Sequence, residues 1–503
     1  MAERATPVTK RAREADTEDA NELADWLASP ACNMRPEEVA VTLPLLDDYG
    51  AKFSSDLQYL SSALVGKLKP KLKPVAFEKL RAGMAMLGSL IASEHPQPAA
   101  PVAATNVRAT PSSPQFQREV DIKKLVTFMA ATGTNADVQK KVCAIIGSVC
   151  ASSAETRAKA GAAGAVEAVV AALRAHGANE AVQSRGCAAL GSLCNDDADN
   201  QAKAGAAGAI EAVAAALRVH HSNAAVQEYG CLALFSLCAA DADNGAKAGG
   251  AGAIEAVVAA LRAHGANARV QQIGCAALFS LCAADADNQA KAGAAGAIEA
   301  VAAALRVHHS NAAVQEKGCI VLGDLCADNN ADNRAKAGGA GAIEAVVAAL
   351  RAHSTDAGVQ EQGCWALRAI CCNNPDNKTK AGSAGAIEAV VAALRAHGAH
   401  AGVQWNGCAA VVNFCGDNPD NQAKAGAAGA IEAVVAAMCA HGANAGVQEQ
   451  GCWALHNLCW THASNRARAR AAGAVAAVNA AREAFMEGAV AVRAKAALER
   501  INA

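Results

Sequence analysis

Residues 421–459 read NQAKAGAAGAIEAVVAAMCAHGANAGVQEQGCWALHNLC, and close copies of this stretch occupy most of the chain on both sides. The glutamate of its Gly-Ala-Ile-Glu step returns at intervals of 44, 44, 44, 45, 44 and 44 residues, at Glu167, Glu211, Glu255, Glu299, Glu344, Glu388 and Glu432. A fixed period of this length indicates a repeat array. One such unit cannot bury its apolar face alone, so the copies are predicted to stack into a solenoid whose extended surface serves binding.

Each copy is predicted to form three helices. In one copy, Asp287-Asn288 is predicted to cap a short first helix that Gly293 ends. After Gly296, apolar residues at helical spacing predict a second helix, and Glu299 in its first turn suits the helix dipole. The third helix is predicted to run from near Asn311 through Cys326.

Sixteen of the 19 cysteines form eight pairs whose members lie seven residues apart. The pairs are Cys143/Cys150, Cys187/Cys194, Cys231/Cys238, Cys275/Cys282, Cys319/Cys326, Cys364/Cys371, Cys408/Cys415 and Cys452/Cys459. Seven residues of helix span roughly 10.5 Å, beyond the roughly 7 Å between alpha carbons that a disulfide tolerates. The thiols are therefore predicted to be reduced and packed as small apolar groups, and no metal site or cofactor is expected.

Two other periodic features could suggest metal binding. A histidine closes each second helix, at His176, His220, His264, His308, His353, His397 and His441. Each lacks a ligand partner at close sequence spacing, so these histidines are predicted to cap helices. The Asp-Ala-Asp-Asn turns at 241–244 and 285–288 lack the glycine and closing glutamate of a calcium loop, which makes them predicted caps as well.

The chain before the array has a different composition. Residues 1–20 are polar and are expected to be disordered, and Lys10-Arg11-Ala12-Arg13 within them is either a solvated tail or a short nuclear import signal. Residues 21–93 are predicted to form a small helical module that, over 45–86, resembles a sterile alpha motif domain. Such a domain implies self-association or partner docking. Residues 94–118 are rich in proline and are predicted to be a linker.

The array itself is predicted to fill residues 119–503, with a degenerate first repeat, seven close copies and a C-terminal cap. Residues 421–459 resemble an armadillo repeat: Asn-Gln-Ala-Lys in the first helix, Ala-Gly-Ala-Ile-Glu-Ala-Val-Val in the second and Val-Gln-Glu-Gln-Gly-Cys-Trp-Ala-Leu-His-Asn-Leu in the third. The resemblance implies an all-α fold, a right-handed alpha-alpha superhelix. Gly426 departs from the family, which has a larger apolar residue there, and this predicts a weaker first helix.

Differences between copies mark the positions that packing does not fix. Counted from the first cysteine of each pair, the variable places are −3, −2, +1, +4 and +5. At about 100° per residue they form one stripe on the third helix, whereas the two cysteines and the leucine at +3 lie on the other side. The stripe is predicted to be exposed and to bind a partner.

In the armadillo family this stripe resembles the surface on which a Trp-x-x-x-Asn pair holds an extended peptide. The pair is complete here at Trp453 and Asn457, whereas Trp365 is followed by Ala369 and Asn413 is preceded by Ala409. The predicted protein-binding residues are Trp365, Trp405, Asn413, Trp453, Asn457, Glu228, Glu316, Asp324, Glu361 and Glu449. The acids among them predict that the partner segment is basic, steered by acids and anchored by tryptophans.

Composition narrows the classes of function. The net charge is −2 and the pI near 6.7, so no nucleic-acid partner is expected. A charged residue interrupts each apolar run before about 18 residues, so neither a membrane span nor a lipid anchor is expected, and the predicted location is cytoplasmic, with a nuclear one left open. No catalytic motif is recognisable, which predicts a protein that is not an enzyme.

The sequence therefore predicts a protein-binding scaffold or adaptor that holds an extended partner segment in the groove of an armadillo solenoid. Two alternatives stay open. A nuclear import adaptor of the importin-alpha type would need a ladder of Trp/Asn pairs. An architectural protein would self-associate through the N-terminal module and leave the groove idle.

Overall fold

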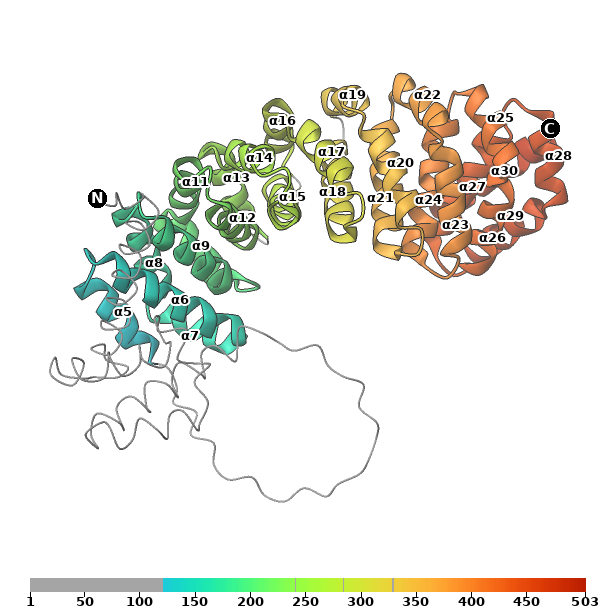
Figure 1. The fold of residues 1–503 in the computed structure, drawn as a ribbon. Helices are drawn as coiled ribbons and strands as arrows, with labels where there is room; N and C mark the ends of the chain where they lie inside the picture. Colours follow the sequence, from blue (N-terminus) through green and yellow to red (C-terminus); the bar gives the residue numbers. More distant parts are fainter. Residues whose placement is uncertain (1–120, 240, 284, 328–329) are drawn as a thin grey trace, which may run out of the picture. The chain divides into compact units, whose positions relative to one another are not determined.

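The protein is described by a computed structural model over residues 121–503, apart from residues 240, 284, 328 and 329. Every regular element in these residues is a helix, as Figure 1 shows. The predicted tail, helical module and linker, residues 1–20, 21–93 and 94–118, lie outside the described residues. The all-α repeat solenoid that the sequence predicts is confirmed for the part of the chain that is described.

The helices fall into three groups that alternate along the chain. The first helices of the repeats are α7 (Ala154–Ala162), α10 (Ala198–Ala207), α13 (Ala242–Gly250), α16 (Ala286–Ala295), α19 (Ala331–Gly339), α22 (Pro375–Ala384), α25 (Pro419–Ala428) and α28 (Ala463–Ala471). The second helices are α5 (Ile122–Ala131), α8 (Ala165–Ala175), α11 (Ala209–Val219), α14 (Ala253–Ala263), α17 (Ala297–Val307), α20 (Ala342–Ala352), α23 (Ala386–Ala396), α26 (Ala430–Ala440) and α29 (Ala474–Ala484). The third helices are α6 (Ala136–Ser152), α9 (Glu180–Cys194), α12 (Ala224–Cys238), α15 (Ala268–Cys282), α18 (Ala312–Leu325), α21 (Ala357–Cys371), α24 (Ala401–Cys415), α27 (Ala445–Leu458) and α30 (Gly488–Asn502).

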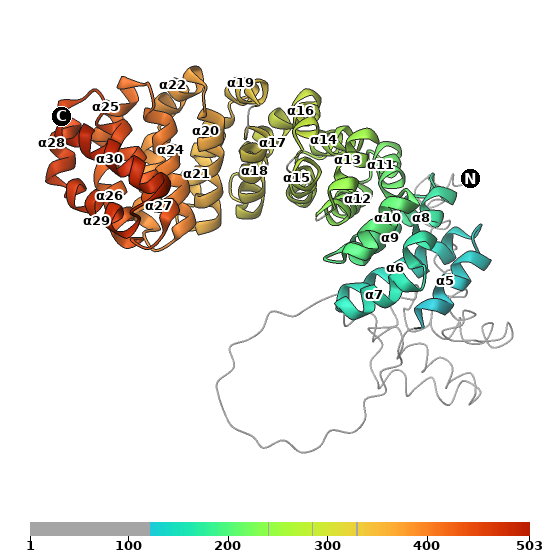
Figure 2. The ribbon, with the colours of Figure 1, turned by 180° about the vertical axis from the view of Figure 1, so that it is seen from behind.

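Each helix packs against its counterpart in the next repeat. Third helices contact third helices from α6 to α30, and second helices contact second helices in the same order. Both views of the ribbon show this succession along the array (Figures 1 and 2). Among the described residues no single helix is long and apolar enough to cross a membrane, and the one pair that reaches the length together, α25 and α26, is bent by 69°.

The first helix α16 differs from the prediction at both ends. Asp285, rather than Asp287-Asn288, caps α16, and its side chain accepts from the backbone N–H of Asn288. The helix then runs through Gly293 and ends at Gly296, whose φ of +83° is a left-handed conformation that glycine adopts without strain. The third helix α18 begins after its cap Asn311, as predicted.

A buried asparagine explains the glycine inside each first helix. Asn288 Nδ2 donates to the carbonyls of Gly245 at 2.9 Å and Leu281 at 2.7 Å, so one amide joins α16 to α13 and α15. A Cβ at Gly249 would lie 1.9 Å from the Oδ1 atom of Asn288. The same asparagine–glycine contact recurs at Gly161, Gly205, Gly293, Gly338, Gly382 and Gly426. The glycine thus makes room for the next repeat, and it does not end the first helix.

A buried glutamine holds the turn between the second and third helices. Gln404 Nε2 donates to the carbonyls of Leu394 and His397, both at 2.9 Å. Equivalent pairs of bonds are made by Gln139, Gln183, Gln227, Gln271, Gln315, Gln360 and Gln448. Because both carbonyls lie at the end of a second helix, the amide supplies donors that the helix itself lacks.

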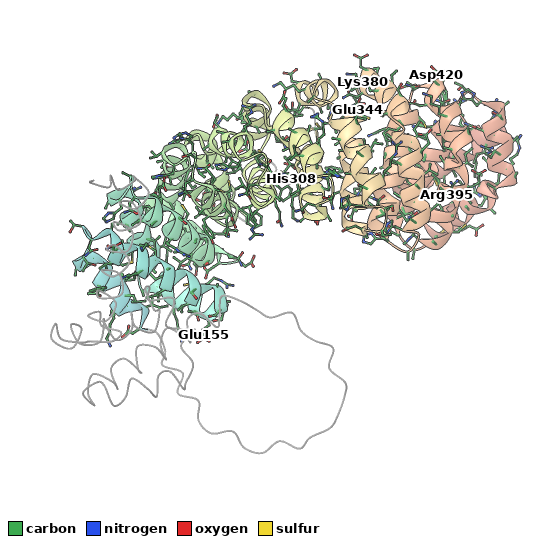
Figure 3. All side chains as sticks on the ribbon, viewed as in Figure 1. Glu155, His308, Glu344, Lys380, Arg395 and Asp420 are labelled. Atoms are coloured by element: carbon green, nitrogen blue, oxygen red, sulfur yellow. The ribbon has the colours of Figure 1, made fainter. Side chains whose placement is uncertain are left out.

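The periodic histidines occupy helix C-caps, as predicted, and they also join neighbouring repeats. The backbone N–H of His308 donates to Ala304 at 2.9 Å, and its ring Nε2 lies 2.8 Å from the carbonyl oxygen of Gly265, 43 residues earlier. Figure 3 labels His308 together with Arg395, whose Nη2 donates to the carbonyls of Ala428 and Gly429 in the next repeat. The sequence did not reveal these inter-repeat bonds.

All sixteen paired cysteines are buried and reduced. Burial raises the pKa of the Cys187 and Cys194 thiols to about 12, because a thiolate would lose its hydration. Cys439, which is not part of a pair, is exposed. The prediction that the pairs act as small apolar packing groups is confirmed.

Candidate protein-binding face

The candidate binding surface is the third-helix face, defined as the positions −3, −2, +1, +4 and +5 of each third helix. The opposite side is buried: Cys275, Leu278 and Cys282 on α15 are 0%, 0% and 0% exposed. On the face itself the +5 position differs from the others, because Ser236 and Ser280 are buried, as is Ala369. The +5 place therefore lies largely beneath neighbouring helices. The other places are accessible in some repeats only, because Ile273 and Asn406 at −2, Ala409 at +1 and Val412 at +4 are buried as well.

The glutamates at position −3 lie against the start of the next third helix. Glu316 and Glu361 are partly buried, and a Cβ at Gly402 on α24 would lie only 2.5 Å from the carboxylate oxygens of Glu361. The side chain of Glu316 approaches Gly358 on α21 in the same way. A carboxylate at a helix N-terminus is stabilised by the helix dipole. These two acids therefore have a role within the array.

Three of these acids also contact cationic or ionisable groups. Arg269 Nε donates to Glu228 at 3.0 Å, and Lys317 Nζ donates to Glu316 at 3.1 Å. Glu361 lies 3.8 Å from His400 Nδ1, and that nitrogen also accepts from the backbone N–H of Val403. Glu449 is partly buried on α27. The acidic character of the face is consequently weaker than the count of glutamates suggests.

Asp324 and the two asparagines occupy the +5 place. Asn413 Nδ2 donates to the carbonyl of Arg368 at 2.8 Å, and Asn457 Nδ2 donates to that of Val412 at 3.0 Å. Both carbonyls belong to the preceding third helix. Asp324 is partly buried and lies near enough to Cys282 to add to the burial that raises the pKa of this thiol. The asparagine amides thus bond to main chain within the array.

Two tryptophans and one arginine form a cluster, the Trp–Arg–Trp clamp, made of Trp365, Arg368 and Trp405. The Arg368 guanidinium lies over both indoles, with its carbon 5.1 Å from the ring centre of Trp365 and 4.6 Å from that of Trp405. Trp365 fills the space over Gly323 of α18, where a Cβ would meet its ring at 2.1 Å. Two predicted binding residues are thereby brought together by Arg368, which the sequence analysis did not single out.

The complete Trp/Asn pair lies beside the C-terminal helix. Arg493 of α30 stacks on the Trp453 ring at 3.7 Å, and His456 Nδ1 lies 3.1 Å from the carbonyl oxygen of Ala496. Trp453 is partly buried and packs against the core. Trp453, one member of the pair most typical of the family, is thus in contact with the C-terminal helix of the array, α30.

Apolar side chains that the sequence analysis passed over occupy the same face on α12 and α15. They form the apolar patch, defined as Tyr229, Leu232, Phe235, Ile273 and Phe279. Phe279 is 39% exposed and Ile273 is buried. Tyr229, Leu232 and Phe235 are partly buried and pack against the core. These residues stand at −2, +1 and +4, the variable places. The signal was present in the sequence, but only the tryptophans were considered as anchors.

Comparison with known proteins finds similarity in fold and no match in sequence. No protein-family model and no curated protein matches it. An engineered protein of known structure is similar at a TM-score of 0.67 and 19% identity, over 96% of this chain and 99% of the other. A structure described as showing a conserved phosphorylation switch that controls the interaction between cadherin and beta-catenin is similar at a TM-score of 0.57 and 14% identity, over 94% and 99% of the two chains. At these identities the likeness shows the helical-repeat fold.

Proposed function

We propose that the protein is a non-enzymatic scaffold that holds an extended segment of a partner protein along its third-helix face. The observation that carries the proposal is the contrast on the third helices. Their inner side repeats the same buried cysteines and leucines, whereas their outer positions hold different and often large side chains. Side chains that packing does not require and that remain accessible are typical of a binding surface.

The composition of the face supports a protein partner. Tryptophan, tyrosine and arginine are enriched where binding energy concentrates, and the Trp–Arg–Trp clamp and the apolar patch bring these types to one face. The similarity in fold to a structure that concerns the interaction between cadherin and beta-catenin agrees with this use of the fold. We propose a segment that is basic beside the acids at −3 and apolar beside α12 and α15.

The import-adaptor alternative gains no support from the geometry. It relies on Trp/Asn pairs open to a peptide, and the complete pair, Trp453 and Asn457, is in contact with Arg493 and with the carbonyl of Val412. The architectural alternative depends on residues 1–118, which lie outside the described residues, and it stays a prediction. Sedimentation of the full chain and of a chain lacking those residues would test it.

Replacing Phe279 by aspartate is expected to weaken peptide binding by at least about tenfold, because it puts a charge into the apolar patch. Binders would first be selected by the full chain from a display library of random dodecapeptides. Their affinities for wild type and Phe279→Asp would then be measured by fluorescence anisotropy. Phe279 is 39% exposed and lies in the last turn of α15, so the substitution also removes some buried apolar area and places a negative charge near a helix C-terminus. The free energy of unfolding is therefore measured for each variant, and affinities are compared at a temperature where all are fully folded.

The matched control is Val307→Asp. Val307 is 56% exposed and ends the second helix α17, away from the third-helix face. Wild-type affinity in this variant and reduced affinity in Phe279→Asp would assign binding to the third-helix face. Equal affinities for all three proteins, or an inability to select any binder, would contradict the proposed function.

A further inference from the structure

The guanidinium of Arg368 is a cation without an anionic partner on the proposed binding face. It is held between Trp365 on its own helix and Trp405 on the next third helix, and both contacts are made through ring faces. In the described part of the chain no carboxylate lies within ion-pair distance of it, and its Nη1 atom is buried without a hydrogen-bond acceptor.

Stacking satisfies only part of what a guanidinium can bind. The two indoles contact the guanidinium through their rings, whereas its five N–H groups lie in the plane of the group, where hydrogen bonds to an acceptor form. A buried donor without an acceptor costs free energy, because its bond to water has been lost. Partial burial also lowers the pKa of Arg368, although an arginine remains charged at neutral pH. The clamp therefore orients the charged guanidinium of Arg368, whose Nη1 atom has no hydrogen-bond acceptor.

The surroundings select the kind of anion. Phosphate groups are bound by clusters of arginine and lysine, which balance about two negative charges. On the preceding third helix, α18, Lys317 is paired with Glu316, and Glu361 lies two turns before Arg368 on α21. A single cation near acids suits a single negative charge. The planar fork of arginine matches the two oxygens of a carboxylate.

We infer that Arg368 receives the carboxylate of one aspartate or glutamate in the partner segment, as the fixed acidic position of an otherwise basic or apolar sequence. This inference rests on the proposed function, since it places that segment across α21 and α24. Trp365 and Trp405 hold the guanidinium in place before binding, which reduces the ordering that binding requires. Their rings also flank the carboxylate and reduce its access to water.

The test uses peptides that the full chain selects from the display library, each remade with Glu, Gln, Lys or phosphoserine at every position in turn. Wild type is expected to bind the best Glu peptide about 10- to 100-fold more tightly than its Gln counterpart. Arg368→Met is expected to bind the two equally, and Arg368→Lys to retain an intermediate preference. Arg368→Glu is expected to prefer the Lys peptide.

Arg269→Met is the matched control, because Arg269 lies at the start of a third helix and is already paired with Glu228. It is expected to keep the Glu preference. Thermal unfolding of each variant checks that the fold is intact, and the Gln peptide serves as an internal reference for binding that does not involve the charge. A Glu preference that survives Arg368→Met would overturn the assignment of the site.

The remaining outcomes separate the two proposals. Peptides that bind wild type with no preference between Glu and Gln at any position would overturn the carboxylate site and leave the proposed function standing. A stronger preference for phosphoserine than for Glu would overturn the choice of carboxylate. If no peptide is selected at all, the proposed function fails and the inference fails with it.

Discussion

Raising the pH from about 8 to about 10.5 is expected to unfold the array, because folding holds its paired cysteines in the protonated form. Burial raises the pKa of Cys187 and Cys194 from the ordinary value of 9.0 to about 12, and the other pairs are buried in the same way. In the unfolded chain these thiols meet water and titrate near pH 8.5. The unfolded state therefore loses protons at a pH where the folded state keeps them.

The direction of the effect follows from this difference. A group whose pKa is higher in the folded state contributes its full stabilisation below its unfolded pKa and loses it as the pH rises toward the folded value. Above about pH 9, each fully protected thiol lowers the free energy of unfolding by about 1.4 kcal/mol per pH unit. Two thiols per repeat give about 2.7 kcal/mol per unit, and the repeats share the effect along the array.

The measurement combines circular dichroism with thiolate absorbance near 240 nm under reducing conditions. Thiolates of the sixteen paired cysteines are expected to form together with the loss of helix, because these side chains are buried in the folded array. In a Cys187→Ala/Cys194→Ala variant, the stability of the second repeat is expected to depend less steeply on pH. If the paired thiols ionise near pH 9 while the helices persist, the burial argument is wrong.

The fold could be predicted because the same sequence pattern recurs in every repeat of the array. The recurrence of Glu299 and its equivalents set the period, and the cysteine pairs identified the buried side of the third helices. Local chemistry also predicted that a third helix starts near Asn311, where the structure has the N-cap, since a side-chain oxygen at a helix start is a short-range feature. Bonds between repeats were harder to foresee, because Asn288 and His308 reach carbonyls 43 residues away.

The candidate site was predicted less completely, for a similar reason. Helical angles placed Trp365 and Trp405 on one face, but they could not show that Arg368 contacts both rings. Nor could they show that Asn457 donates to the preceding helix, since that depends on how closely the third helices pack. A rule based on one helix describes which residues share a face, and it leaves open which of them the neighbouring helix covers.

Helix propensity acts within one helix, whereas packing depends on the next repeat. This difference predicts opposite outcomes for two substitutions in one helix. Gly245 and Gly249 both lie inside α13, where alanine is favoured over glycine by about 1 kcal/mol. A Cβ at Gly245 would meet nothing within 4 Å, whereas a Cβ at Gly249 would lie 1.9 Å from Asn288 Oδ1. Gly245→Ala is therefore expected to stabilise the protein by about 0.5–1 kcal/mol.

Gly249→Ala is expected to destabilise it by about 2–3 kcal/mol, despite the same gain in helix propensity. To escape the new methyl group, Asn288 must shift the amide that donates to the buried carbonyls of Gly245 and Leu281, and each acceptor left without a donor costs about 1–3 kcal/mol. Urea unfolding followed by circular dichroism measures both variants. Adding Asn288→Ala to each separates the causes: it should abolish most of the penalty of Gly249→Ala and leave the gain from Gly245→Ala in place. A penalty that persists without the asparagine would mean that the glycine is needed for the helix itself, and that the contact between repeats is not its reason.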